Sequence, residues 1–154
     1  MKTDELPRRF RRLLESRRIR RFPGGESAVA EEVEAARHDL AEAEESLERG
    51  SHKWATIQGY YAIFHAARAL LFARGYREKS HSALAEAIKA LYVDRGRLAE
   101  RHQDAHFNAI SLRETADYRS EFSDRGAFQV AAGARDYVTA AEAILREEGF
   151  TLPA

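Results

Sequence analysis

Apolar residues recur every three or four positions along most of this chain, and this helical spacing limits its folds more than any other feature. The clearest case is the segment "HKWATIQGYYAIFHAARALLFARG", residues 52–75, which is apolar almost all the way round. Such a helix is usually buried, so we expect this one at the centre of the molecule. Only three prolines occur, and no alternating pattern predicts a strand. The chain is therefore predicted to be all-α.

Turn residues divide this pattern into six helices. We expect a first amphipathic helix over 4–19, a second ending at Arg49, a third over 52–74, a short one over 82–92, a long fifth ending at Tyr118 and a sixth over 123–148. Four long helices plus shorter ones are typical of an antiparallel up-and-down bundle. Side chains spaced for burial in the third and sixth helices are Trp54, Ile57, Tyr61, Phe64, Ala67, Leu70 and Leu71, and Phe128, Ala131, Ala134, Val138, Ala141 and Leu145.

The composition fits one domain over residues 1–154, since 44% of the residues are hydrophobic and 32% are charged. The absence of cysteine excludes disulfides and thiolate metal sites. No signal sequence and no apolar run of roughly 20 residues occurs, so we expect neither secretion nor a membrane span. The cytoplasm is the expected location.

The net charge of zero hides a basic N-terminal helix at residues 1–22. This segment has nine basic and three acidic residues, 9 − 3 = +6, which leaves −6 for the rest. Such an arm can bind RNA phosphates, or it can pack on its own acidic helices or on a dimer mate. Only Phe10 and Phe22 are aromatic there, which gives little support for base stacking.

The stretch "RETADY" near the end of the fifth helix provides our candidate catalytic residues, Arg113, Asp117 and Tyr118. Positions i and i+4 share a helix face, so Arg113 and Asp117 can form an ion pair, with Tyr118 about 100° further round. One interpretation is a structural clamp at a dimer seam, with the Tyr118 hydroxyl satisfied. The others are a phosphate site built on Arg113, or a site that cleaves RNA.

The loop "REKSH" provides candidate phosphate- or nucleotide-binding residues, Lys79, Ser80 and His81. They precede a helix, where free backbone N–H groups and the helix dipole favour an anion. The alternative is ordinary capping by Ser80 or Ser82.

Three further histidines are weaker candidates. His102 and His106 are one helical turn apart, as metal ligands can be, but no third ligand is evident, so we expect a solvated face. His65 lies among apolar residues, where a hydrogen-bonded core histidine is the usual explanation. We predict no metal and no cofactor.

The segments "WATIQGYYAIFHAARALLFARGYREKSHSAL" and "LRETADY", followed by an alanine-rich helix, resemble the small stand-alone prokaryotic HEPN domain proteins over roughly residues 28–148. The resemblance implies a helical bundle that forms a homodimer. It also implies pairing with a minimal nucleotidyltransferase in two-gene toxin–antitoxin modules, and some members are metal-independent ribonucleases.

The ribonuclease motif of that family is an arginine followed, after four to six residues, by a histidine. Arg113 matches the arginine, but Tyr118 stands where the histidine would be. An unperturbed tyrosine titrates near 10 and exchanges protons poorly at neutral pH. Arg101 and His106 also have the required spacing and are kept as an alternative register. We therefore expect an RNA- or nucleotide-binding protein with a degenerate motif, the alternatives being an active ribonuclease toxin and a structural adaptor.

Overall fold

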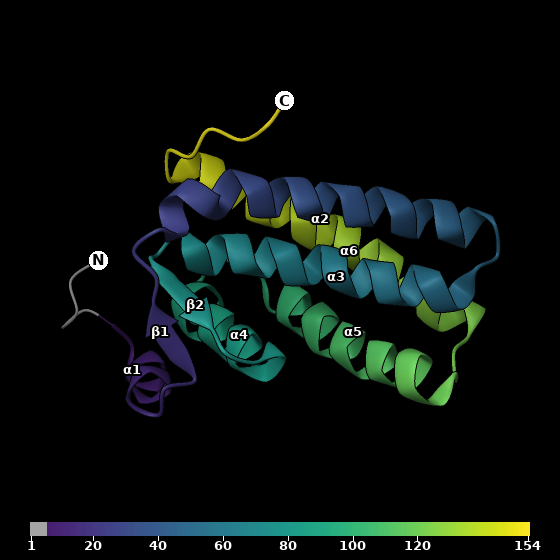
Figure 1. Cartoon of the computed structure of the whole chain (residues 1–154), viewed down its shortest axis with the longest axis horizontal. Coiled ribbons are helices and arrows are strands. Elements are labelled where there is room, and N and C mark those ends of the chain that lie inside the picture. Colours follow the sequence, from purple (N-terminus) through teal and green to yellow (C-terminus); the bar gives the residue numbers. More distant parts are fainter. Residues whose placement is uncertain (1–5) are drawn as a thin grey trace.

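Helix α3, His52–Phe72, lies at the centre of an antiparallel helical bundle, as the sequence predicts (Figure 1). The computed structural model describes residues 6–154. The other elements in chain order are α1 Arg8–Glu15, β1 Ile19–Arg21, α2 Gly25–Glu48, β2 Tyr76–Glu78, α4 His81–Ile88, a π-helical turn Lys89–Val93, α5 Glu100–Arg119 and α6 Asp124–Glu147. The expected all-α fold class is confirmed.

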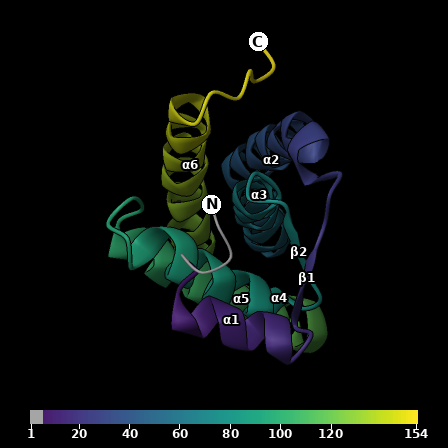
Figure 2. The same ribbon diagram turned by 90° about the vertical axis from the view of Figure 1, so that its left-hand side faces the viewer.

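The apolar sequence of α3 explains its central place. Its residues are buried on several sides, and it packs against α2, α4, α5 and α6. Seen end-on in Figure 2, α3 lies between α2 and the group formed by α4 and α5, with α6 at the side. Gly59 of α3 permits the close approach of α6, because a Cβ there would lie 2.8 Å from Val130 Cγ1.

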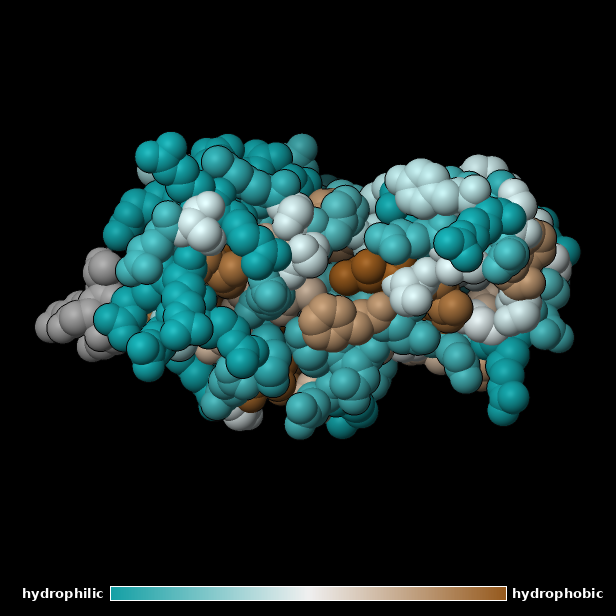
Figure 3. All heavy atoms as spheres, turned by 90° about the horizontal axis from the view of Figure 1, so that it is seen from below, coloured by the Kyte–Doolittle hydropathy of each residue, from teal (hydrophilic) through white to brown (hydrophobic). Residues whose placement is uncertain are grey.

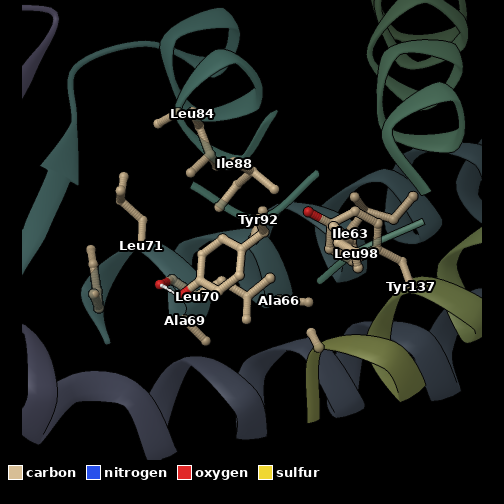
Figure 4. Close-up of a cluster of buried hydrophobic side chains, with 14 of the residues drawn as sticks. Ile63, Ala66, Ala69, Leu70, Leu71, Leu84, Ile88, Tyr92, Leu98 and Tyr137 are labelled. Carbon is tan, nitrogen blue, oxygen red and sulfur yellow. Dashed lines mark hydrogen bonds between the residues drawn. The ribbon is translucent and has the colours of Figure 1, made fainter. Parts of the chain in front are cut away.

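Tyr92 joins the shorter helices to α3 in the core. Its hydroxyl donates to the Leu70 carbonyl at 2.6 Å, the bond drawn in Figure 4, and accepts from Arg74 Nε at 3.2 Å. Burial is the main cause that raises the pKa of Tyr92 to about 12. A neutral tyrosine with both hydrogen-bond functions used is a stable way to bury this polar group.

A small antiparallel sheet, β1 with β2, contradicts the expectation that no strand occurs. Ile19 pairs with Glu78, and Arg21 pairs with Tyr76. Three residues are too few to show an alternating pattern, so the strands leave little trace in the sequence. Ile19 and Tyr76 are buried, and the sheet connects α1 to the bundle.

Several predicted boundaries and burials need correction. The first helix ends at Glu15 rather than near residue 19, and its expected start at residue 4 lies outside the described residues. Phe10 and Leu13 of α1 are buried, which fits the predicted amphipathic helix, but Trp54 and Phe128, predicted to be buried, are 54% and 61% exposed. In residues 6–154 no helix is both long and apolar enough to cross a bilayer.

Candidate functional site

Arg113 lies on α5 with its guanidinium held among tyrosine rings. Its Nη2 donates to Tyr61 Oη of α3 at 3.0 Å. The guanidinium carbon lies 5.3 Å from the ring centroid of Tyr60, 5.5 Å from that of Tyr61 and 5.6 Å from that of Tyr118. At these separations each ring face attracts the cation. The side chain is only 15% exposed, so its position is fixed by α3 as well as by α5.

The predicted pair of Arg113 and Asp117 is present but loose. Arg113 Nη2 and Asp117 Oδ2 are 3.7 Å apart, and the Asp117 side chain is 40% exposed. Tyr118 is 74% exposed, and within residues 6–154 its hydroxyl has no hydrogen-bond partner, unlike the satisfied hydroxyl expected for a clamp. α5 ends just beyond it, where Ser120 adopts a left-handed conformation with φ of 52°.

His81 shares the Tyr60 ring with Arg113. The imidazole stacks on Tyr60 at 5.5 Å and on Phe64 at 5.1 Å between ring centroids. Burial, followed by the positive charge of Arg113, lowers the pKa of His81, while Glu114 opposes this shift. His81 is therefore neutral at pH 7, and it can donate or accept a proton beside the arginine.

The other two residues of the predicted phosphate loop have different surroundings. Ser80 caps α4, since its Oγ accepts a hydrogen bond from the Ala83 amide at 3.1 Å. The backbone amide of Lys79 donates to the Arg18 carbonyl at 3.0 Å. Its side chain is exposed and has no ion-pair partner among the described residues. The structure thus brings His81, but not the Ser80 hydroxyl, into contact with the aromatic group around Arg113.

His65 is the hydrogen-bonded histidine that the sequence predicts, and it belongs to a charged network. Its Nδ1 lies 2.6 Å from Glu32 Oε2, and its Nε2 lies 3.6 Å from Asp39 Oδ2. Arg68 extends the network to Glu78 of β2 at 2.9 Å. The His65 ring is 6.5 Å from that of Tyr61, so the network borders the Arg113 site.

The expectation of a solvated face for His102 and His106 is wrong, because both side chains are buried, at 3% and 0% exposure. Both rings pack edge-on against Tyr137. Burial is the main cause that lowers the pKa of His106 to about 4. Within the described part of the chain, no group of three or more candidate ligands could hold a metal ion.

Arg101 and His106, the two residues of the alternative register, lie apart in space. Arg101 is 68% exposed and pairs with Asp136 at 3.0 Å, whereas His106 is enclosed by the core. A residue five positions further along a helix lies about 140° round it, which explains the separation. Arg101 and His106 do not form a common site.

Tyr60, Tyr61 and Phe64 are site residues that the sequence pattern did not reveal, since it predicts only burial for Tyr61 and Phe64 and assigns no role to Tyr60. Their signal in the sequence is the run "YYAIF", in which hydroxyl-bearing rings lie next to each other on an apolar helix. A buried tyrosine hydroxyl usually has a partner, but the pattern does not show that the partner of Tyr61 is Arg113, 52 residues away.

A helical bundle that carries an arginine near the end of one helix, held by aromatic side chains of the central helix, defines the structural class. The profile of the HEPN domain matches residues 29–148, and the chain belongs to the HEPN domain family. A protein of Methanocaldococcus jannaschii named "Putative toxin MJ0605" is 29% identical over 89 residues, which cover 58% of this chain. The match covers 66% of that relative's length.

Proposed function

We propose that this HEPN protein acts as the RNA- or nucleotide-binding component of a two-gene, toxin–antitoxin-like module whose other component is a minimal nucleotidyltransferase. The family and the name of the M. jannaschii relative support a toxin-like role. Tyr118 at the position of the motif histidine favours binding over cleavage.

The observation that carries this proposal is the incompletely compensated charge of Arg113. A largely buried cation is normally paired and fully hydrogen-bonded. Here Nη2 bonds a neutral tyrosine, Asp117 is 3.7 Å away, and Nε has no hydrogen-bond partner within the described residues. A phosphate oxygen would bring negative charge closer than Asp117 does and accept hydrogen bonds from the guanidinium.

The test measures the affinity of Arg113→Ala and Arg113→Lys for RNA and for nucleotides by fluorescence anisotropy. We expect Arg113→Ala to weaken binding by at least about tenfold, and Arg113→Lys to restore part of it, since lysine keeps the charge but not the planar fork. Arg101→Ala is the matched control, because Arg101 lies on the same helix and pairs with Asp136 outside the site.

Thermal melting of the same variants separates binding from support of the fold. Intact binding by Arg113→Ala together with a large loss of stability would identify a structural clamp and refute the proposal. Co-expression with a nucleotidyltransferase encoded beside this chain tests the paired module. Failure of the two proteins to co-purify would argue against the pairing.

A second candidate function is metal-independent RNA cleavage, favoured by the neutral His81 beside Arg113. An imidazole with a lowered pKa can accept the proton of a 2′-hydroxyl, while the arginine stabilises charge on the phosphate. Cleavage of labelled RNA in EDTA, lost in His81→Ala, would support it. If cleavage were lost in His106→Ala but not in His81→Ala, this role of His81 would be contradicted. Activity gained by Tyr118→His alone would indicate a decayed nuclease site.

A further inference from the structure

An open cleft of about 660 Å³ lies between α1, α4 and α5, away from the Arg113 site. Phe107 of α5 forms part of its wall. Arg113 is six residues further along α5, which places it about 9 Å along the axis and about 120° round the helix. The α1 residues of the cleft lie outside the part of the chain that the HEPN profile matches.

The charge lining the cleft is strongly positive. The lining contains four cations and one carboxylate, that of Glu86, which gives 4 − 1 = +3. The cations are Arg9, Arg12, Arg18 and Lys89. Figure 3 shows predominantly hydrophilic side chains over this end of the molecule.

Only some of these cations are neutralised. Arg18 Nη1 pairs with Glu86 at 2.6 Å, and Lys89 pairs with Asp94 at 3.2 Å. The guanidinium groups of Arg9 and Arg12 have no ion-pair partner among residues 6–154, and both side chains are exposed. Two neighbouring guanidinium groups without an ion-pair partner in this part of the chain are suited to binding phosphate in a bidentate manner.

The cleft also has an aromatic wall and an amide. Phe107 is 46% exposed, and its ring contacts no other aromatic ring in the described chain. Gln103 is 3% exposed; its Nε2 donates to the Ala85 carbonyl at 3.1 Å, and its Oε1 has no hydrogen-bond partner within the described residues. An exposed ring can stack with a base, and a fixed amide oxygen can accept from a base N–H group.

We propose that this cleft binds a nucleoside phosphate, either as a free nucleotide or as one nucleotide of single-stranded RNA. The phosphate lies against Arg9 and Arg12, and the base stacks on Phe107, near the Gln103 amide. The cations alone would suit any anion. The exposed ring among them selects an anion that carries a flat aromatic group.

Two fluorescent probes, labelled AMP and a labelled single-stranded oligoribonucleotide, test the site on the full chain. Arg9→Gln with Arg12→Gln should weaken binding by at least about tenfold. It should also reduce the slope of log affinity against log salt by about 0.7 for the oligonucleotide, the value for one neutralised phosphate of a single strand. Arg8→Gln with Arg11→Gln is the matched control, because it removes the same charge from the same helix outside the cleft.

The aromatic wall is tested separately. Phe107→Ala should weaken binding about five- to 150-fold, the usual contribution of one stacked base, and Phe107→Tyr should restore it. Binding of AMP identifies a free nucleotide as a ligand, and binding of the oligonucleotide alone identifies an RNA strand. Either result supports the site.

Other outcomes overturn the proposal. Equal losses from the two arginine pairs would show a diffuse charge effect. Unchanged binding by Phe107→Ala, with inorganic phosphate competing as well as AMP does, would show a simple anion site. An acidic peptide that displaces both probes while Phe107→Ala still binds it would point to a protein ligand. Repeating the series on Arg113→Ala separates this site from the proposed function, since the effect of Phe107→Ala should persist there.

Discussion

Arg113 Nη2 of α5 donates to Tyr61 Oη of α3 at 3.0 Å, and this hydrogen bond links the sequence motif to the central helix. Asp117, the neighbour in sequence, is further away at 3.7 Å. The orientation of the arginine therefore depends more on a residue 52 positions away than on its own helix turn.

Tyr61→Phe should lower the free energy of unfolding by about 1 kcal/mol, because it removes a hydrogen bond to a charged group but keeps the ring. Urea unfolding followed by circular dichroism measures the change. Tyr118→Phe is the control and should change stability by less than about 0.5 kcal/mol, since its hydroxyl is solvated. Equal effects would show that the bond to Arg113 contributes nothing.

Gly59→Ala should destabilise the protein by about 1 to 3 kcal/mol, because the new methyl group would overlap Val130 Cγ1 of α6. This cost must exceed the helix-propensity gain of about 1 kcal/mol that alanine brings. Val130→Ala removes the clashing methyl group, so the double variant should be more stable than the sum of the two single changes predicts. Strictly additive effects would contradict the close packing of α3 against α6.

Stability should fall as the pH drops from about 6.5 towards 4, because burial lowers the pKa of His106 to about 4 in the folded protein. The unfolded chain takes up a proton below about pH 6.5, while the folded one stays neutral at this position. The stabilisation is therefore complete above 6.5 and is lost at up to about 1.4 kcal/mol per pH unit. His81 and His102, whose pKa values are also lowered, act in the same direction.

His106→Gln should flatten this pH dependence, measured by denaturant unfolding at several pH values. His38→Gln is the control, because the His38 side chain is 73% exposed. An unchanged slope in His106→Gln would mean that His106 is not the buried titrating group.

The length of a pattern explains which parts of the fold were predictable. Helices of 20 residues or more repeat their apolar spacing several times, so α2, α3, α5 and α6 were predicted close to their observed ranges. A strand of three residues is too short to repeat its alternating pattern, so the sequence does not predict β1 and β2. Phe128 has the correct spacing for burial, yet it lies near the start of α6 and remains 61% exposed.

Only part of the candidate site could be predicted from the sequence. Arg113 and Asp117 lie on one helix, so their spacing predicts their contact. Tyr60, Tyr61 and His81 reach Arg113 only through tertiary packing, which local spacing does not encode. The burial of His106 was missed because polar neighbours in "RHQDAH" hide which side of α5 faces the core.

We expect a homodimer formed through the end of the bundle where α5 ends and α6 begins. Large exposed aromatic side chains are found at this end: Trp54, Tyr118, Phe122 and Phe128. Exposed apolar groups of this kind favour an interface between copies of a chain.

Light scattering should give twice the chain mass of 17.5 kDa. Phe128→Glu should give monomers, whereas Phe107→Glu, outside this end, should not. A single-chain mass for the unmodified protein would contradict the prediction.

The pairing of β1 with β2 delays the docking of the arginine-rich segment during synthesis. Ile19 pairs with Glu78, so its partner strand is complete only after 78 − 19 = 59 more residues have been added. At about 5 to 20 residues per second, this takes about 3 to 12 seconds. Helix α4, against which α1 packs, is made later still. Helix α1 is therefore synthesised well before the elements that it packs against, so its cations are accessible to other molecules until those elements are made.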